Sequence, residues 1–314
     1  MRLRGTRHGG LAHNWGRRQR RISARAEKVG RTAMRVLIGC NIRKEGSAEL
    51  AAELVALLKK SGFAPCVYGR DSEYADTIGA EIIETPAICN FAVTVGGDGT
   101  ILKWGKVAAE YDIPLLGVNM GRLGFMATLE PHEISCIPEL LNSDFSVSRR
   151  ILLECKVFRE EREIFSERVL NDVILSRSSV SKLPEYVVNC GAAEVSRVRA
   201  DGIVFSTPTG STAYSLSAGG PILSPDLECI EFTALCPHTL FNRPMLFSDK
   251  QIITARANHY QNSKATFSVD GGTGIPFMEG DILQIMRSKL SLGLIETGSG
   301  FYGAIHNKLM TPFK

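Results

Sequence analysis

The chain has 314 residues, 44% of them hydrophobic and 22% charged, which is ordinary globular composition and enough for two packed domains. No run approaches the roughly 18 consecutive apolar residues of a membrane-spanning helix, so no membrane partner is expected. Residues 1–33 hold ten of the 37 Lys and Arg and one of the 33 acids, which leaves 27 basic and 32 acidic residues. A body with a net charge of −5 has no general attraction for nucleic acid.

Residues 1–33 are a basic N-terminal extension. Arg-rich, acid-poor segments of this kind serve as targeting peptides or as nucleic-acid-binding arms. This one has few large apolar residues and no apolar face of helical spacing. We therefore predict a disordered extension ahead of a folded body that begins at Met34.

The eight cysteines are scattered and form no CxxC pair. This spacing predicts neither a disulfide framework nor a zinc site. Several of the cysteines lie inside apolar runs, as buried free thiols do. A reducing compartment, the cytoplasm, is therefore expected.

Residues 34–145 alternate short apolar runs with segments of helical periodicity. The predicted elements are a strand at 34–39, a helix capped by Ser47 and ended by Gly62, strands at 66–68 and 91–95, a helix at 100–111 and a strand at 114–118. Strands that alternate with helices predict a Rossmann-like α/β domain with a parallel sheet.

Residues 146–296 have a different pattern. Short segments with period-two alternation follow one another between turn signals, and little of this region has helical spacing. We predict a second, β-rich domain that resembles a β-sandwich.

The first chemical signal is Gly96-Gly97-Asp98-Gly99-Thr100, between a predicted strand and a predicted helix. Glycines and a helix N-terminus together favour phosphate binding. A carboxylate beside a phosphate is repulsive, unless Asp98 holds Mg²⁺ or accepts a proton from an attacking hydroxyl. The alternative is a plain capped turn. The loop matches neither the Walker motif nor the dinucleotide fingerprint.

Two further loops are rich in glycine. Residues 119–125 (Asn-Met-Gly-Arg-Leu-Gly-Phe) suit the floor of a pocket, although a simple turn explains them equally well. Residues 201–221 combine hydroxyls and glycines, which suit ribose, amide and phosphate groups, with Tyr214, on which a base can stack. The apolar lead-in at 203–205 argues against a flexible linker.

These loops together resemble the NAD kinases, and the likeness extends from Met34 to Lys314. Asn171-Asp172, Pro237-His238, Arg243-Pro244 and Asp270-Gly271 add to it. The resemblance implies transfer of the ATP γ-phosphate to the adenosine-ribose 2′-hydroxyl of NAD, with a divalent metal, Mg²⁺, for which no ligand residue is assigned. It also implies a homo-oligomer, dimer or tetramer, and a final segment, residues 297–314, that packs back on the first domain.

The resemblance also implies roles for single residues. Asp98 would be the general base, with Gly99 and Lys103 beside the substrate. Asn171 and Asp172 would contact the adenine or the nicotinamide-side ribose of NAD across a subunit contact. The remaining positions of the predicted site are Gly97, Thr100, Asn119, Phe125, Lys182 near phosphate, Arg199, Asp201, Thr209, Gly210, Ser211, Thr212, Ala213, Tyr214 and Ser217.

Some alternatives remain open. A diacylglycerol-type lipid kinase would share the loop at 96–100, but it predicts a more apolar acceptor groove than the polar run at 207–217. A non-catalytic NAD-binding sensor would not need the Asp98 carboxylate. Arg199 either pairs with Asp201 and fixes the pocket shape, or is an exposed strand-end residue without a role.

Overall fold

The structure is a computed structural model that describes residues 33–121, 124–127, 129–178, 182–240, 242–258, 264–297, 300–306 and 309. The predicted disordered extension, residues 1–33, lies outside this range apart from its last residue. No helix within the described part of the chain is long and apolar enough to cross a membrane.

Five parallel strands form the sheet of the first domain, in the spatial order β5-β4-β1-β2-β3. Their bounds are β1 (Arg35–Cys40), β2 (Ala64–Tyr68), β3 (Glu81–Ile83), β4 (Phe91–Gly96) and β5 (Leu115–Asn119). β1 and β4 are almost wholly buried because helices cover both faces of the sheet, as parallel sheets require.

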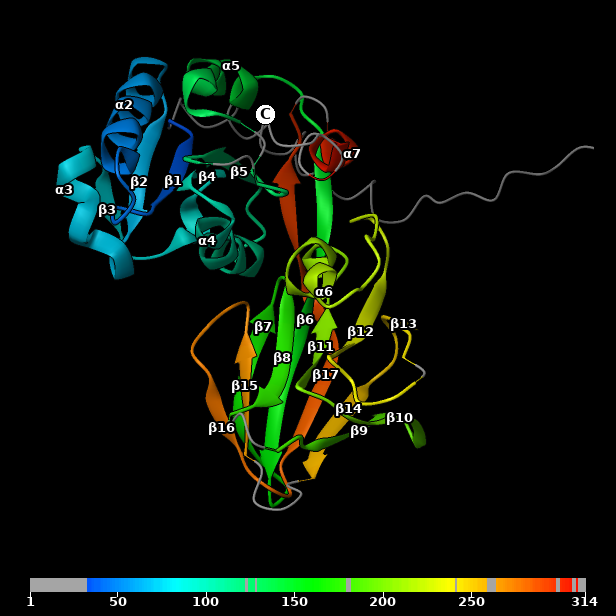
Figure 1. The fold of residues 1–314 in the computed structure, drawn as a ribbon. Helices are drawn as coiled ribbons and strands as arrows, with labels where there is room; N and C mark the ends of the chain where they lie inside the picture. Colours follow the sequence, from blue (N-terminus) through cyan, green and yellow to red (C-terminus); the bar gives the residue numbers. More distant parts are fainter. Residues whose placement is uncertain are drawn as a thin grey trace, which may run out of the picture.

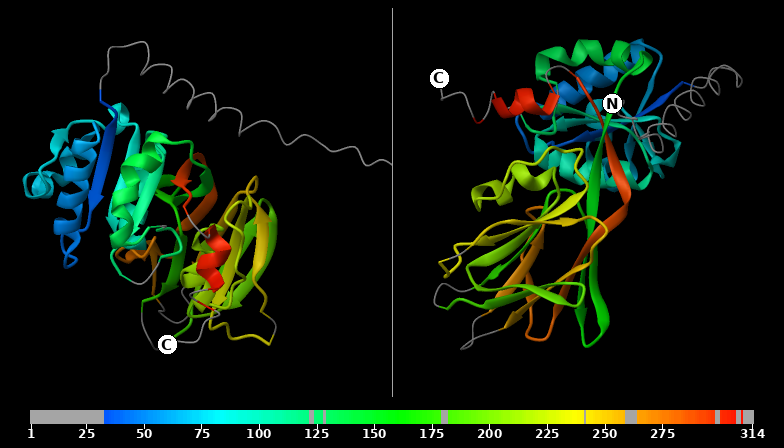
Figure 2. Two further views of the ribbon diagram at one scale, coloured as in Figure 1. Left: turned by 90° about the horizontal axis from the view of Figure 1, so that it is seen from above. Right: turned by 90° about the vertical axis from the view of Figure 1, so that its right-hand side faces the viewer.

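The helices α2 (Ser47–Lys60) and α4 (Asp98–Glu110) are the two long crossovers of this sheet. They lead in opposite directions along the sheet, so right-handed connections place them on opposite faces (Figures 1 and 2). α2 buries Ala51, Leu54, Val55 and Leu58, which share one helix face, and its N-cap is Gly46 rather than Ser47. Shorter helices are α3 (Ala75–Ile78) and α5 (Ile137–Asn142).

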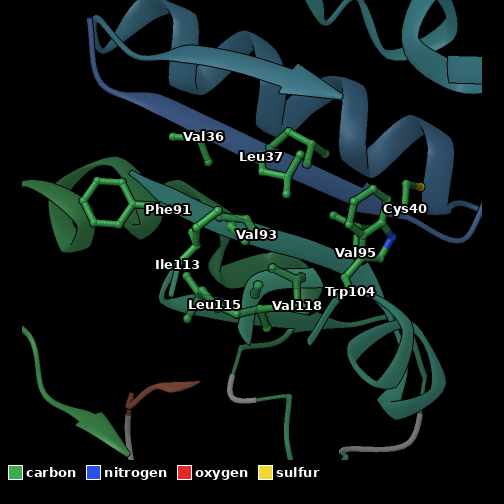
Figure 3. Packing of buried hydrophobic residues seen from close by; sticks show 14 of the residues in the cluster. Val36, Leu37, Cys40, Phe91, Val93, Val95, Trp104, Ile113, Leu115 and Val118 are labelled. Atoms are coloured by element: carbon green, nitrogen blue, oxygen red, sulfur yellow. The ribbon is translucent and has the colours of Figure 1, made fainter. Parts of the chain in front are cut away.

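Trp104 anchors α4 to the sheet. Its side chain is 1% exposed and packs against β1, where a Cβ at Gly39 would lie 2.5 Å from the indole ring. Figure 3 shows Trp104 beside Val95 of β4 within the apolar core. This contact fixes α4, and therefore its first residue, Asp98, against the ends of the two central strands.

Two long strands, β6 (Val147–Arg159) and β17 (Ile282–Ile295), run through both domains (Figure 1). β17 pairs with β5 at Leu294 and Leu115, and farther along it pairs with β14. Leu292 accordingly belongs to the first core and Leu283 to the second. The chain thus returns to the first sheet through β17, before residues 297–314. The helix α7 (Gly300–Ile305) that follows has no buried residue.

The second domain is a pair of mostly antiparallel layers around an apolar core. One layer is a six-stranded sheet in the order β13-β12-β11-β8-β15-β16, and the other continues the first sheet through β14, β9 and β10, with β7 beside β6. The bounds are β7 (Arg162–Val169), β8 (Asp172–Arg177), β9 (Glu185–Cys190), β10 (Ala193–Arg199), β11 (Gly202–Ser206), β12 (Cys229–Leu235), β13 (Met245–Ser248), β14 (Ile253–Asn258), β15 (Ala265–Val269) and β16 (Ile275–Phe277). The predicted fold class, an α/β domain followed by a β-rich domain, is confirmed.

Candidate active site

The topology of the first sheet marks one place for a ligand. From β1 the chain proceeds outward through β2 to β3, whereas β4 and β5 extend the sheet on the other side of β1. Open α/β sheets bind ligands at the carboxyl ends of the strands where the order reverses in this way. In this sheet that place is between the loop after β1, residues 41–46, and Gly97 with the first residue of α4, Asp98.

Asp98 is held by the neighbouring loop. It is the first residue of α4, and its carboxylate accepts hydrogen bonds from the backbone N–H groups of Phe125, at 3.0 Å, and Met126, at 3.4 Å. A Cβ at Gly124 would overlap this carboxylate, so glycine is required there. Each carboxylate oxygen can still accept a second hydrogen bond. The carboxylate is therefore oriented and remains able to accept a proton.

The glycines of the Gly96–Thr100 loop fall into two kinds. Gly96 is needed for packing, because a Cβ there would come within 2.7 Å of the Thr100 Cβ. Gly99 has open space where its Cβ would be, and a Cβ at Gly97 would meet only a lysine ammonium at 4.0 Å. Neither has a positive φ that would demand glycine. Their lack of side chains leaves backbone N–H groups open to a ligand such as phosphate.

That lysine is Lys44, which the sequence analysis did not single out. Its Nζ lies 4.0 Å from the position of a Cβ at Gly97 and 2.7 Å from that of a Cβ at Gly121. Gly121 is held in turn by Asn119, whose Nδ2 donates to the Gly121 carbonyl at 2.7 Å. Within the described residues the Lys44 ammonium has no hydrogen-bond or ion-pair partner. The available signal was a basic residue in the loop after the first parallel strand.

A second set of predicted residues lies at the end of the second domain that faces the first domain. The Asn171 carbonyl accepts the Thr207 N–H at 2.8 Å, and the Thr207 hydroxyl donates to the Leu170 carbonyl at 2.6 Å. Gly210 packs so closely on the Asn171 backbone that a Cβ would overlap it. These contacts join the segment 170–172 to the loop at residues 207–212, here called the hydroxyl-rich loop.

Two buried polar atoms in this set have no partner among the described residues: Asn171 Oδ1 and the Thr209 hydroxyl. An unsatisfied buried polar group costs about 1–3 kcal/mol. The neighbouring hydroxyls are used internally, since Ser211 donates to the Pro208 carbonyl at 2.7 Å and Thr212 to the Thr209 carbonyl at 3.3 Å. Asn171 and Thr209 are thus the two members of the set with a buried polar atom that can bind a ligand or water.

Asp172 is 4% exposed and lies beneath the short helix α6 (Tyr214–Ser217). Burial and, to a smaller extent, the nearby Asp270 carboxylate raise the pKa of Asp172 to about 7, against the opposing effect of a hydrogen bond from the Tyr214 backbone. The Tyr214 side chain is 47% exposed and Ser217 is also exposed, while Ala213 connects them to the hydroxyl-rich loop. The tyrosine ring is therefore accessible for stacking against a base.

Behind α6 lies a buried carboxyl group that the sequence analysis missed. Glu231 of β12 is fully buried, and the Ser215 hydroxyl donates to its Oε1 at 2.6 Å. The Thr233 hydroxyl is 3.2 Å from the same oxygen, and a Cβ at Gly220 would overlap it. Burial raises the pKa of Glu231, against the effect of the two hydroxyls. This cluster fixes α6 from below.

Three predicted residues do not join the others within one chain. β8 and β11 pair so that Asp172 faces Ser206 and Ser176 faces Gly202. Asp201, one residue before Gly202, is therefore roughly 17 Å, five residues of strand, from the Asn171-Asp172 end. It pairs with Arg177 at 2.9 Å, and Arg199 accepts the His238 N–H on its carbonyl at 2.8 Å. Lys182 is exposed beyond the end of β8.

The remaining predicted residue, Lys103, is exposed on α4, with its Nζ 5.6 Å from the centre of the Trp104 ring. Asn171 and Asp172, predicted to reach across a subunit contact, lie next to α4 of their own chain, because the adjacent Leu170 side chain packs against Gly105.

Comparisons with known proteins identify the family of this chain. Residues 36–144 match the ATP-NAD kinase N-terminal domain and residues 170–297 the ATP-NAD kinase C-terminal domain. The chain is 34% identical to the NAD kinase of Natranaerobius thermophilus over 276 residues, which are 86% of this chain and 95% of that protein. It is also 34% identical to the NAD kinase of Geobacter metallireducens, over 81% of this chain and 89% of the relative.

Two solved structures share the fold. A yeast NADH kinase complexed with NADH superposes with a TM-score of 0.77 at 24% identity, over 90% of this chain and 89% of the other. An NAD kinase from Archaeoglobus fulgidus in complex with ATP superposes with a TM-score of 0.65 at 22% identity, over 88% of this chain and 99% of the other. None of these matches supports a lipid kinase or a non-catalytic sensor. The chain therefore belongs to the NAD kinase family, and it is an enzyme that phosphorylates NAD with ATP.

Proposed function

We propose that the γ-phosphoryl group of ATP passes to the 2′-hydroxyl of the adenosine ribose of NAD at the carboxyl ends of β1 and β4. The observation that carries this assignment is the Asp98 carboxylate, held by two backbone N–H groups at the N-terminus of α4, between two glycines that packing does not require. A carboxylate in a loop suited to phosphate supports a role in proton transfer rather than binding alone.

In the proposed step, Asp98 accepts the proton of the 2′-hydroxyl as its oxygen bonds to the γ-phosphorus. The bond between that phosphorus and the β,γ-bridging oxygen breaks, and its electron pair leaves with ADP. The unpaired N–H groups at the start of α4 and the Lys44 ammonium face the developing negative charge. Catalysis then rests on positioning and electrostatics.

Magnesium is proposed to enter with ATP. In nucleotide sites Mg²⁺ is held by substrate phosphates, water and one or two protein carboxylates rather than by a full protein ligand set. The described residues contain no group of three His, Cys, Asp or Glu side chains able to hold a metal, whereas Asp98 offers one carboxylate at the phosphate loop. The donor set therefore fits a metal carried by ATP, which would neutralise phosphate charge.

The acceptor, NAD, is proposed to lie on the segment 171–172 and the hydroxyl-rich loop. Support comes from the unpartnered Asn171 Oδ1 and Thr209 hydroxyl, which suit the hydroxyl and amine groups of adenosine, and from the exposed Tyr214 ring. The stacking of one base on an aromatic ring contributes about 1–3 kcal/mol to binding.

A homo-oligomer accounts for the predicted residues that lie elsewhere. Lys182, Arg199 and Asp201 gather at the other end of the second domain, a strand's length from Asp172. We propose that they complete the pocket of a neighbouring subunit. The compartment is proposed to be the cytoplasm, on the ground that all eight cysteines are free thiols.

The direct test is to incubate the purified protein with ATP, Mg²⁺ and NAD and to measure NADP with an NADP-specific dehydrogenase. Asp98→Asn serves as the matched control, and diacylglycerol as the competing acceptor. Formation of NADP by the parent alone supports the assignment. NAD binding without NADP formation would indicate a sensor, and lipid phosphorylation would indicate the other kinase class.

A further inference from the structure

Asp270 makes an unusual set of contacts at the junction of the two domains. Its side chain is 5% exposed and follows β15 in a left-handed conformation, with φ of 49°. The carboxylate accepts the backbone N–H groups of Leu170, at 3.0 Å, Asn171, at 2.7 Å, and Asp172, at 3.2 Å. The Asp270 N–H donates in return to the Asp172 carbonyl at 2.9 Å. The backbone of the proposed NAD-binding segment is thus wrapped around this carboxylate.

Lys106 of α4 reaches the same carboxylate from the first domain. Its Nζ lies 2.8 Å from Asp270 Oδ2 and 2.6 Å from Glu167 Oε1 of β7. Burial alone would lower the pKa of Lys106, but the two carboxylates outweigh it and raise that pKa, so the lysine is charged. Since the side chains of Lys106 and Asp270 are only 21% and 5% exposed, water screens this pair less than it screens a surface pair.

The neighbouring residue brings the helix and the loop into direct contact. A Cβ at Gly105 would lie 2.9 Å from a methyl carbon of Leu292 and 3.1 Å from one of Leu170. Glycine therefore lets α4 rest on residue 170, next to Asn171. Gly105 sets how close the helix approaches, and the Lys106 ion pair sets its position along the contact.

Asp98 and Lys106 are eight residues apart on one helix, roughly 12 Å along a rigid axis. We propose that Lys106 and Asp270 are positioning residues that hold the acceptor-binding segment, residues 170–172, at the distance from Asp98 that phosphoryl transfer needs. This inference rests on the proposed function. Neither residue is assigned a contact with substrate; both act through Asn171 and Asp172.

The contacts suggest that Lys106 can be removed without unfolding the segment. Asp270 keeps its three backbone N–H donors when Lys106 is absent, so the segment retains its internal hydrogen bonds. The interaction that is lost is the ion pair between Asp270 and Lys106 of α4. Because a displacement of about 1 Å can reduce a rate 100-fold, the effect should appear in catalysis more than in stability.

The test compares Lys106→Met with Lys106→Arg, which keeps the charge. The matched control is Lys156→Met, which breaks an ion pair with Glu163 at 2.9 Å between β6 and β7. The Lys156 side chain is about as exposed as that of Lys106. Lys106→Met should lower kcat/KM for NAD about tenfold or more, with KM for ATP unchanged within about twofold. Lys106→Arg should recover most of the loss, and Lys156→Met should match the parent.

A double-mutant cycle isolates the pair. In an Asp270→Asn background, Lys106→Met should have little further effect, because residues that act together are not additive. Unchanged kcat/KM for NAD in Lys106→Met would overturn the proposal. Equal losses of kcat/KM in Lys106→Met and Lys156→Met, in proportion to their losses of Tm, would also overturn it. Additive effects of Lys106→Met and Asp270→Asn in the double-mutant cycle would do the same. A parent that binds NAD by calorimetry yet makes no NADP would instead refute the proposed function, which keeps the two failures distinct.

Discussion

The buried carboxyl group of Asp172 predicts how stability depends on pH. Burial, aided by the charge of Asp270, raises its pKa from 3.8 to about 7 in the folded protein. In the unfolded chain the carboxyl has an ordinary pKa near ~3.9. Between about pH 4 and 7 the folded state therefore binds more protons at this site than the unfolded state does, so the free energy of unfolding falls as pH rises through this window. Above about pH 7 the contribution is constant.

The size of the effect follows from the same values. A difference of about three pKa units at ~1.4 kcal/mol each amounts to an upper limit of ~4 kcal/mol. Asp172→Asn removes the titration, while the amide oxygen can still accept the hydrogen bond from the Tyr214 backbone. The variant should therefore lose less stability than the parent between pH 5 and pH 8.

The assay is urea denaturation of parent and variant at several pH values, without substrates. Glu231 is a second buried carboxyl group whose pKa is raised by burial, so it contributes a slope of the same sign. Glu231→Gln, alone and combined with Asp172→Asn, separates the two contributions. If the parent and Asp172→Asn lose equal stability between pH 5 and pH 8, the carboxyl of Asp172 does not titrate as argued.

Three further predictions concern the phosphate side of the site. Asp98→Asn should lower kcat by about 10²–10⁴-fold, the usual effect of losing a general base, with NAD affinity by calorimetry nearly unchanged; turnover within a few-fold of the parent would exclude this role. Lys44→Met should raise KM for ATP about tenfold or more and leave KM for NAD unchanged, because a charge-assisted bond to phosphate is lost; equal changes in both constants would contradict this. Gly99→Ala should keep or slightly raise Tm, because its Cβ meets no atom, but should reduce activity by crowding the phosphate; full activity would refute the proposal that a ligand approaches here.

Local patterns in the sequence were enough to predict the class of fold, which is confirmed, whereas the chemistry of the loop after β4 stays a prediction. The apolar runs at 34–39, 91–95 and 114–118 became β1, β4 and β5 within a residue or two, because a strand buried on both faces is apolar throughout. The sequence of the loop after β4 indicated phosphate chemistry because its glycines, its carboxylate and the start of the helix are neighbours in the chain.

Only the tertiary structure decided how these parts meet. Lys44 and Gly121, Asp98 and Phe125, and Lys106 and Asp270 are brought together across 77, 27 and 164 positions of the chain. The hydrophobic periodicity of the sequence does not predict such pairs, because it indicates which face of one element is buried but not which element packs against that face. The pKa of Asp172 depends on burial and on the charge of Asp270, which follows β15, and the place of β17 beside β5 depends on hydrogen bonds between strands that are distant in the chain. The sequence by itself determined the elements and the reactive groups, whereas the electrostatics and the positioning of the site arise from contacts that exist only once the chain has folded.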